Sequence, residues 1–363
     1  MKYFTKEIPD EKYLVKTAGV KARDDVETIL EGAGYQELRI PAIMEDRRSL
    51  GKVKKFQAHF QIRKVWSKVT RDIGAGDTIL IQYPTIEHSI FLSSVFRDIR
   101  KRGGRIIFLI HDLDYLRMAV AGYENMTRMK KKRLEIEQKA LHFGNRIIVH
   151  NQDMLEKMVE LGLDRRKLVS LEIFDYIIPE LTEDMVVPSE PKDDSLDAPV
   201  IIAGNLSRTK AGYVYNLPDT VKFNLYGVNY EDEEKSNIFY KGSFMPDELP
   251  YNLSGSFGLV WDGESAEECE GAFGKYLKIN NPHKTSLYLA SGIPVIIWKE
   301  AALAKFVQEN EAGIVVDSLY EIPDKLKSLS NEDYERLKNG ARSVSEKLKK
   351  GYFTLAAVKK CKG

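Results

Sequence analysis

Residues 280–298, NNPHKTSLYLASGIPVIIW, contain a loop, a short helix, a tight turn and a buried strand within nineteen residues. Asn281 suits an N-cap, and Pro282 suits the first helical position, where its missing N–H is no loss. Lys284 then falls in the first turn, beside backbone N–H groups that have no helical partner. These donors and the lysine ammonium predict a site for a diphosphate. The alternative is an ordinary capped helix with a solvated lysine.

The strand Val295–Trp298 follows because Ser291-Gly292 ends the helix and Pro294 prevents its continuation. Strands and helices alternate in this way along most of the chain, which predicts βαβ units and parallel sheets. Further strands are expected at Tyr13–Lys16, Gln36–Ile40, Thr78–Gln82, Arg105–Ile110, Arg146–Val149, Lys167–Ile173, Val200–Ala203, Lys222–Tyr226, Ile238–Lys241, Phe257–Trp261 and Gly313–Val316. Helices are expected at Arg47–Arg71, His88–Arg102, Asn125–Phe143, Asp153–Leu161, Lys284–Ala290, Glu300–Glu309, Asn331–Lys350 and Tyr352–Lys359.

The alternation is interrupted once, by the proline-rich and acidic segment of residues 179–199. We therefore predict an α/β protein of two doubly wound, Rossmann-like parallel-sheet domains, residues 1–180 and 199–344, joined by a linker at 181–198. Ligands of such sheets sit beyond the carboxyl ends of the strands. A crevice between two facing domains is the expected site.

Composition limits the class of protein. The chain has 363 residues, of which 43% are apolar and 30% charged, as in soluble proteins with two domains. No apolar run approaches the ~18 residues of a membrane span. The start, MKYFTKEIPDEKY, lacks the apolar core of a secretion signal, so a cytoplasmic location is expected. Cys269 and Cys361 form no metal or redox pattern.

Charge is divided unevenly between the halves. Residues 1–180 hold 33 Lys and Arg against 26 Asp and Glu, whereas the remainder holds 22 against 28. The predicted helix Arg47–Arg71 has nine basic residues and no acidic one. Its apolar residues are expected on one face, which fits an anionic membrane surface or a second copy of the chain. No nucleic-acid-binding module is recognised. Those apolar residues are Leu50, Val53, Phe56, Phe60 and Trp66.

Two stretches of the second half are candidates for nucleotide binding. Gly204 follows a buried strand, where a ligand can approach the backbone, and Arg208 offers a planar fork for phosphate oxygens. Near the next strands, Gly242 is expected to expose backbone to a nucleobase edge, with Phe244 or Tyr226 against the ring face; such aromatics are more often core. Neither a GxGxxG nor a GxxxxGK[ST] motif is present.

The stretch HDLDYLR, residues 111–117, leaves the carboxyl end of a predicted strand in the first half. Asp112 or Asp114 would serve as a base that takes the proton of an attacking hydroxyl. The alternative is that one of these aspartates caps a helix and the other lies in solvent. Asp24 and Asp25 are weaker candidates for the same role. No metal site is expected, because the carboxylates are not clustered and lysine and arginine can carry the phosphate charge.

The motifs KARDD, GDTILIQYP, IIFLIHDLDYLR, RIIVHN, IIAGNLSR, LVWDG and NNPHKTSLYLASGIPVI together resemble bacterial β-1,6-galactofuranosyltransferases and the related glucosyltransferases of streptococcal adhesins. The resemblance covers nearly the whole chain. It implies a GT-B fold, a UDP-sugar donor bound mainly by the C-terminal domain, and no metal or other cofactor. It also implies that the chain beyond about Ser345 (residues 345–363) returns to the N-terminal domain.

The resemblance also implies residue roles. Asn205, Arg208, Asn281, Lys284 and Ser286 would contact the donor. Retaining GT-B enzymes carry two glutamates around the stretch aligned with residues 280–292, and this chain has none there, so an inverting mechanism is expected. On the acceptor side the resemblance implies Thr17, Lys21, Asp24, and Asp112 or Asp114.

The sequence thus predicts an inverting, metal-independent transferase that moves a hexosyl unit from UDP to a hydroxyl of a glycan or lipid-linked glycan. Galactofuranose is the sugar that the resemblance favours. A UDP-glucose transferase of the same fold is the first alternative. The second is a two-domain protein that binds a nucleotide or sugar without catalysis.

Overall fold

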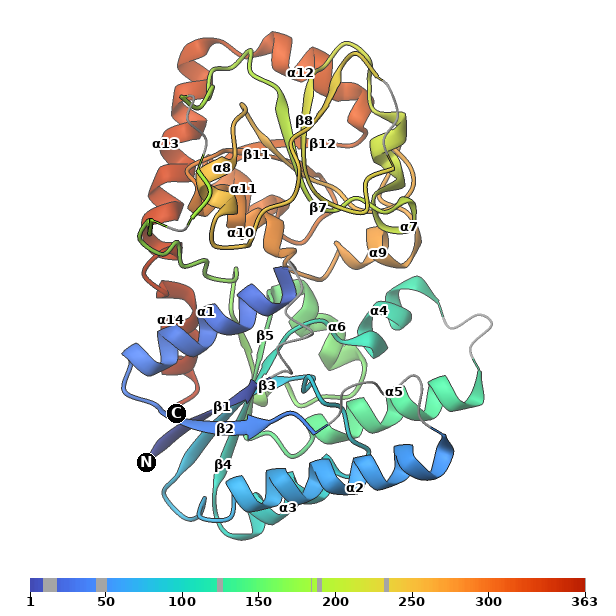
Figure 1. Ribbon diagram of the computed structural model, residues 1–363, viewed down its shortest axis with the longest axis vertical. Coiled ribbons are helices and arrows are strands. Elements are labelled where there is room, and N and C mark those ends of the chain that lie inside the picture. The colour runs from blue at the N-terminus through green and yellow to red at the C-terminus, as the bar shows by residue number, and fades with distance from the viewer. Residues whose placement is uncertain are drawn as a thin grey trace.

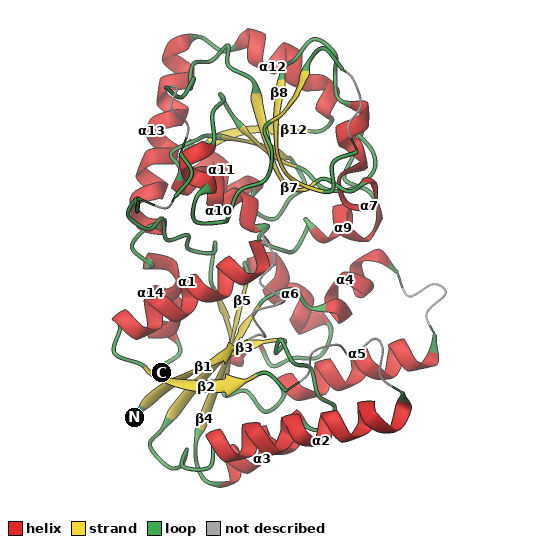
Figure 2. Cartoon of the chain, viewed as in Figure 1, coloured by secondary structure: helices red, strands yellow, loops and turns green. Residues whose placement is uncertain are grey.

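The first half of the chain forms a six-stranded parallel sheet in the computed structural model, which describes residues 1–8, 18–43, 51–122, 127–183, 185–187, 191–231 and 235–362. The spatial order of its strands is β2-β1-β3-β4-β5-β6. Strands β3, β4 and β5 are largely buried apolar runs because helices cover both faces of the sheet (Figure 2). The strands are β1 (Lys2–Ile8), β2 (Gln36–Pro41), β3 (Thr78–Tyr83), β4 (Arg105–Ile110), β5 (Arg146–Val149) and β6 (Leu168–Ser170). The helices are α1 (Ala18–Gly32), α2 (Lys52–Val69), α3 (Leu92–Lys101), α4 (Asp114–Ala121), α5 (Arg128–Leu141) and α6 (Gln152–Glu160).

The second half forms another six-stranded parallel sheet, with the order β12-β11-β10-β7-β8-β9. The order reverses between β7 and β10, and the carboxyl edge at such a reversal is the usual ligand position in open α/β sheets. The strands are β7 (Val200–Asn205), β8 (Phe223–Val228), β9 (Ile238–Tyr240), β10 (Gly258–Val260), β11 (Val295–Trp298) and β12 (Gly313–Val316). The helices are α7 (Arg208–Ala211), α8 (Leu249–Asn252), α9 (Gly271–Tyr276), α10 (His283–Ala290), α11 (Ala304–Glu309), α12 (Ile322–Ser328), α13 (Asn331–Leu348) and α14 (Tyr352–Lys360).

The two halves are stacked along the long axis, with the first sheet below and the second above (Figure 1). Helix α13 runs down the side of the upper half, and α14 then lies beside α1 in the lower half. The carboxylate of Asp175 fixes this return, because it accepts hydrogen bonds from the backbone N–H groups of Phe353 (3.2 Å) and Thr354 (2.7 Å) at the start of α14.

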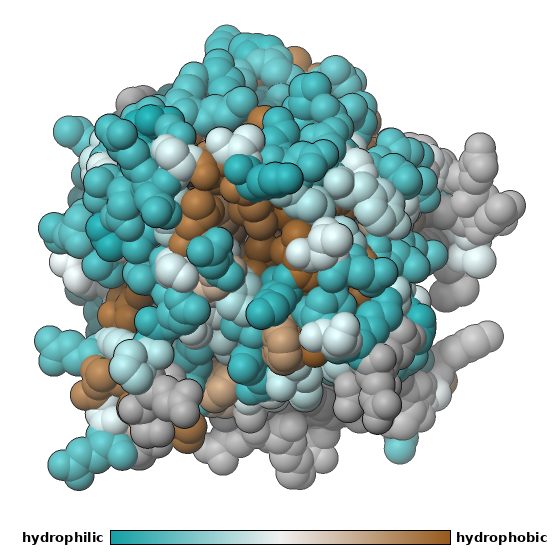
Figure 3. Space-filling model, turned by 90° about the horizontal axis from the view of Figure 1, so that it is seen from above, coloured by the Kyte–Doolittle hydropathy of each residue, from teal (hydrophilic) through white to brown (hydrophobic). Residues whose placement is uncertain are grey.

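One hydrophobic cluster lies mainly in the lower half and includes Tyr276 and Ile279 of the upper half, and another extends through both halves. The second cluster extends from Phe4 and Val26 to Phe353 in α14. At the upper end of the molecule, hydrophobic residues gather in a hollow surrounded by polar ones (Figure 3). Within the described residues, no helix is both long enough and apolar enough to cross a membrane.

Three expectations from the sequence need correction or fall outside the described residues. The first strand of the sheet is Lys2–Ile8, and the strand expected at residues 13–16 lies in the segment that is not described. Helix α4 begins at Asp114 with Leu113 at the N-cap, so neither aspartate of residues 111–117 caps this helix. In α2, the apolar residues do not share one face: Trp66 is fully buried, whereas Val53, Phe56 and Phe60 are exposed. Leu50 is not described.

Candidate active site

Lys284 lies at the reversal point of the upper sheet. It stands in the first turn of α10, and its Nζ donates hydrogen bonds to the carbonyl oxygen of Trp261 and to Oδ1 of Asp262, both at 2.8 Å. Trp261 and Asp262 directly follow β10. Burial alone would lower the pKa of Lys284, but the carboxylate of Asp262 and its other neighbours raise that pKa above the ordinary value. The side chain is therefore a cation held at the carboxyl edge.

The loop after β7 lies beside the segment that follows β10, at the same carboxyl edge as Lys284. The backbone N–H of Gly263 donates to the carbonyl oxygen of Lys210 at 2.9 Å, so α7 and the segment after β10 are neighbours. The Arg208 guanidinium lies 3.8 Å from the ring centroid of Tyr215 and is paired with Glu231, its Nε 2.5 Å from Oε2. Arg208 thus belongs to this edge, with its fork turned toward the end of β8.

Asn205 is the last residue of β7, and its side chain makes hydrogen bonds to neighbouring residues. Its Oδ1 accepts hydrogen bonds from the backbone N–H of Ser207 and from Nδ2 of Asn229, both at 3.1 Å. The strands approach so closely here that a Cβ on Gly227 would lie 1.8 Å from the carbonyl oxygen of Gly204. Asn205 therefore shapes the turn that presents Arg208.

Asn281 and Ser286 connect the upper half to the lower half. Helix α10 begins at His283 with Pro282 at the N-cap, so the expectation that Asn281 caps this helix is wrong. Asn281 Nδ2 instead donates to the carbonyl oxygens of His150 (2.6 Å) and Glu172 (3.1 Å), which follow β5 and β6. Ser286 Oγ donates to the carbonyl oxygen of Phe174 at 2.7 Å. These bonds make the carboxyl edges of the two sheets face each other.

The aromatic residues near β8 and β9 differ in accessibility. Tyr226 is only 2% exposed, and its hydroxyl accepts a hydrogen bond from the backbone N–H of Ser254, so this ring is part of the core. Phe244 is partly buried beside it, with ring centroids 6.3 Å apart. Gly242 has a left-handed φ of +91°, and a Cβ there would meet nothing within 4 Å. Gly242 and Phe244 thus remain accessible, whereas Tyr226 does not.

Sequence reasoning missed a row of tyrosines at this edge. The rings of Tyr215 and Tyr230 are stacked with centroids 5.9 Å apart, and Tyr240 lies 5.3 Å from Tyr230. Tyr240 is exposed, and its hydroxyl donates to the carbonyl oxygen of Gly227. The row ends at Arg208, so an aromatic platform lies next to the predicted phosphate ligand. The three tyrosines come from separate strands and loops, and no spacing in the sequence indicates that they meet.

The lower half contributes the HDLD stretch. Asp112 is exposed and makes no hydrogen bond or ion pair with any described residue, whereas Asp114 forms an ion pair with Arg117 in α4. The backbone N–H of Leu113 lies 3.4 Å from the hydroxyl of Tyr276, at the end of α9 in the upper half. His111 Nε2 lies 2.7 Å from Oε1 of Gln82. Asp112 is therefore an exposed carboxylate near the junction that is not tied up in a hydrogen bond or ion pair with the part of the chain that the structure describes.

Helix α1 carries the remaining acceptor-side residues. Thr17 lies outside the described residues. Lys21 is buried, with Nζ 2.5 Å from Asp25 Oδ1 and 2.9 Å from Asp247 Oδ1 of the upper half. Burial raises the pKa of Asp25 to about 7, against the lowering effect of Lys21. Asp24 is exposed. Lys21 thus connects the halves, and Asp24 is the more accessible carboxylate.

Three histidines meet where the halves join, a feature that the sequence did not indicate. The His111 ring stacks on Phe174 at 5.4 Å, and His150 lies 4.9 Å from the same ring. The His283 ring lies 5.0 Å from that of Tyr176. Burial lowers the pKa of His150 to about 4 and that of His283 to about 3. The junction therefore holds neutral imidazoles at neutral pH.

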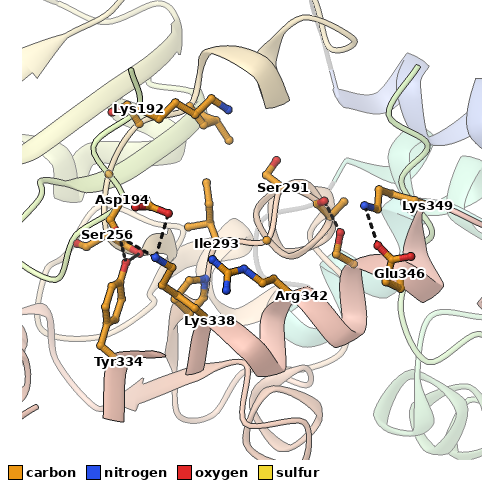
Figure 4. A pocket seen from close by; sticks show the side chains of 17 residues that line it. Lys192, Asp194, Ser256, Ser291, Ile293, Tyr334, Lys338, Arg342, Glu346 and Lys349 are labelled. Atoms are coloured by element: carbon orange, nitrogen blue, oxygen red, sulfur yellow. Dashed lines mark hydrogen bonds and ion pairs between the residues drawn. The ribbon is translucent and has the colours of Figure 1, made fainter. Parts of the chain in front are cut away.

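Neither a cluster of metal ligands nor the described cavity coincides with the predicted site in the described part of the chain. Among the described residues, no three His, Cys, Asp or Glu side chains are grouped so that they would hold a metal ion. A cavity of about 350 Å³ lies along α13, lined by Lys338, Arg342 and Lys349 and by residues 253–256 and 291–294 (Figure 4). Those two segments precede β10 and β11, so the cavity is at the amino edge, opposite Lys284.

Comparison with known proteins links both halves to one family. Residues 2–173 match the N-terminal domain, and residues 200–361 the C-terminal domain, of the family described as glucosyltransferase 3-like. The chain is 36% identical over 281 residues to beta-1,6-galactofuranosyltransferase WbbI of Escherichia coli (strain K12), covering 76% of each chain. It is 26% identical to Glucosyltransferase 3 of Streptococcus gordonii over 92% of this chain and 90% of that one.

Comparison with solved structures identifies the fold. Sucrose-phosphate synthase from Thermosynechococcus elongatus has a TM-score of 0.65 at 13% identity and covers 99% of this chain and 98% of its own. Two parallel six-stranded sheets with facing carboxyl edges and this likeness together confirm the GT-B fold that the sequence resemblance implied. At this level of identity the likeness shows the fold alone.

Proposed function

The chain belongs to the glucosyltransferase 3-like family and is a GT-B glycosyltransferase, and from this premise we propose that it transfers galactofuranose from UDP to a hydroxyl of a glycan acceptor. The choice of sugar is supported by the 36% identity to a protein named as a beta-1,6-galactofuranosyltransferase. The product would belong to a cell-surface polysaccharide or glycoconjugate, made at the inner face of the cell membrane.

The observation that carries this proposal is the position of Lys284. Its ammonium lies at the start of the eight-residue helix α10 and at the reversal point of the upper sheet, where a diphosphate would meet both a cation and the positive end of the helix dipole. Arg208 and the tyrosine row flank the same edge. We assign the pyrophosphate to Lys284 and Arg208, and the uracil to the surface formed by Gly242, Phe244 and the tyrosine row.

The proposed step is a direct displacement at the anomeric carbon. Asp112 takes the proton of the acceptor hydroxyl, the hydroxyl oxygen bonds to the anomeric carbon, and the bond from that carbon to UDP breaks. Configuration at the carbon is inverted because attack and departure occur on opposite faces. Lys284, Arg208 and the α10 N-terminus stabilise the charge that develops on UDP, so the proposal requires no metal ion.

A second donor, UDP-glucose, is favoured by one observation. The alignment to the protein named Glucosyltransferase 3 spans 92% of this chain, whereas the alignment to the galactofuranosyltransferase spans 76%. A nucleotide-binding protein without catalysis is the remaining alternative. We treat both as outcomes of the same assay.

The assay supplies UDP-galactofuranose, UDP-galactose and UDP-glucose with a glycan acceptor and records UDP release in the presence and absence of EDTA. We expect release with UDP-galactofuranose that EDTA does not change, and a product of inverted anomeric configuration by NMR. Tight UDP binding with no release from any donor would favour the non-catalytic alternative. Lys284→Ala and Arg208→Ala should each weaken UDP binding at least tenfold, whereas the exposed Lys305→Ala should not. Unchanged UDP affinity in both variants would refute the assigned site.

A further inference from the structure

Helix α2 carries two apolar stripes on opposite sides. Ala58, Ile62 and Trp66 are buried against the lower half. Val53 is 72%, Phe56 58% and Phe60 43% exposed. At 100° per residue the exposed three lie within about 60° of one another and roughly opposite the buried three. Folding of this chain therefore uses one stripe and leaves the other in water.

The loop between β3 and α3 extends the exposed stripe. Ser89 Oγ donates to the carbonyl oxygen of His59 in α2 at 2.8 Å, and the ring of Phe91 meets that of Phe56 edge-on at 5.5 Å. The same loop exposes Ile86 and Ile90. We call the resulting area the α2 surface. It consists of Val53, Phe56, Phe60, Ile86 and Ile90.

The positive charge of α2 indicates which kind of partner binds this surface. Residues 52–69 contain six lysines and arginines and no acidic residue. Lys64 and Lys68 are exposed beside the apolar stripe, and Lys64 Nζ lies 5.2 Å from the ring centroid of Phe60. Cations that surround inserting aromatic rings match anionic lipid headgroups above an acyl layer. A second copy would bring the same positive charge against this surface, so self-association is disfavoured.

The α2 surface is also placed at the edge that bears the proposed base. Helix α2 follows β2 and the loop with Ile86 follows β3, so both start from the carboxyl edge of the lower sheet. Asp112 leaves that edge after β4. We propose that the α2 surface docks on an anionic lipid bilayer and that the acceptor is a glycan linked to a lipid of that bilayer. The part concerning the acceptor rests on the proposed function.

Binding to vesicles tests the surface. The full chain is sedimented with vesicles of phosphatidylcholine alone or with about one third phosphatidylglycerol. We expect binding only to the anionic vesicles, at least tenfold weaker in Phe56→Ser/Phe60→Ser and in Lys64→Gln/Lys68→Gln, and weaker at high salt. Matched controls on the upper half, Tyr320→Ser and Lys325→Gln/Lys327→Gln, should bind as the unaltered chain does, because these residues are exposed far from α2.

Three results would contradict the proposal that the α2 surface binds a membrane. The first is absence of binding to anionic vesicles, and the second is binding that neither double variant weakens. The third is a dimer in light scattering that Phe56→Ser/Phe60→Ser dissociates, which would assign the surface to a second copy.

Transfer assays test the proposed lipid-linked acceptor independently of the proposed function. With a lipid-linked acceptor in anionic vesicles, Phe56→Ser/Phe60→Ser should lower the rate at least tenfold, whereas transfer to a short water-soluble acceptor should stay within twofold. Equal rates on the lipid-linked acceptor would overturn the acceptor proposal and leave the proposed function intact. Vesicle binding without transfer from any UDP-sugar would refute the function and leave the surface standing.

Discussion

Lys284 and Asp262 form a buried ion pair, with Nζ 2.8 Å from Oδ1 and side chains only 13% and 9% exposed. A diphosphate that approaches Lys284 must share the ammonium with this carboxylate. The pair therefore holds the cation in place when no donor is bound and moderates its affinity for phosphate.

Asp262→Asn should destabilise the fold by about 3–5 kcal/mol, because it leaves a buried ammonium without its counter-ion. UDP supplies an anion, so UDP should raise the melting temperature of this variant more than that of the unaltered chain. Thermal unfolding with and without UDP measures both effects. Asp317→Asn, which removes the exposed partner of Lys299, is the control and should change stability by less than about 1 kcal/mol. A smaller UDP effect in Asp262→Asn would mean that phosphate cannot replace the carboxylate.

The two carboxylates of the HDLD stretch should differ in their effect on rate. Asp112→Asn removes the proposed base and should lower the transfer rate by about 10²–10⁴-fold with little change in UDP affinity. Asp114→Asn weakens an ion pair with Arg117 at the start of α4 and should retain most of the rate. Single-turnover rates and UDP dissociation constants separate the two. Full activity in Asp112→Asn would transfer the role of base to Asp114.

The junction histidines make stability depend on pH. The pKa of His283 is about 3 in the folded chain, below the ordinary value of 6.5, so the unfolded chain binds more protons as the solution becomes acidic. The stability that depends on neutral His283 is present above pH 6.5 and is lost as pH falls toward 3. Between pH 6.5 and 5 the loss is about 2 kcal/mol.

Substitution isolates this effect from the buried carboxyls, which act in the opposite direction. The pKa of Glu27 is raised to about 8, so its contribution is lost as pH rises above its unfolded value of 4.5. We expect His283→Asn to show a shallower loss of stability than the unaltered chain between pH 6.5 and 5 in denaturant titrations. His142→Asn, at an exposed histidine, should leave the slope unchanged. Equal slopes in all three chains would show that His283 does not titrate in this way.

Strand positions were predictable where an apolar run ends at glycine or proline. The bounds of β11 and β12 are those expected from the sequence, because Pro294 and Gly313 delimit apolar runs, of which β11 is buried throughout and β12 at its two ends. Strand β1 was missed because only Phe4 and Thr5 of its seven residues are buried, so no apolar run marks it. The stripe of α2 was misassigned because an apolar residue is compatible with either side of a helix that has two apolar sides.

The sequence allowed us to predict where the site residues lie along the chain, but not which way their side chains face. The sequence places Lys284 at a helix start after a strand, but its partner Asp262 is 22 residues earlier and nothing local indicates the pair. Tyr226 was assigned to a ligand because β8 has no polar face to reveal which residues are core. At the start of α10, the tertiary fold decides which side chains face the donor edge and which face the lower half.

Asn281 gives the sharpest test of that distinction, because the sequence assigned it to the donor and the structure bonds it to the lower half. Its Nδ2 donates to the carbonyl oxygens of His150 and Glu172, and its Oδ1 accepts from Nδ2 of Asn151 at 2.7 Å. Asn281→Ala leaves these buried groups unpaired and should cost about 3 kcal/mol, against about 1 kcal/mol for Ser286→Ala, which loses one bond.

The kinetic consequence separates positioning from donor binding. Asn281 fixes the edge that carries Lys284 relative to the edge that carries Asp112, so its loss should lower the transfer rate about tenfold or more while UDP affinity stays within about twofold. Isothermal titration with UDP and single-turnover transfer, both below the unfolding temperature of the variant, measure the two quantities. If affinity and rate fell together, Asn281 would be a donor ligand, and the hydrogen bonds to His150 and Glu172 would have to open when UDP binds.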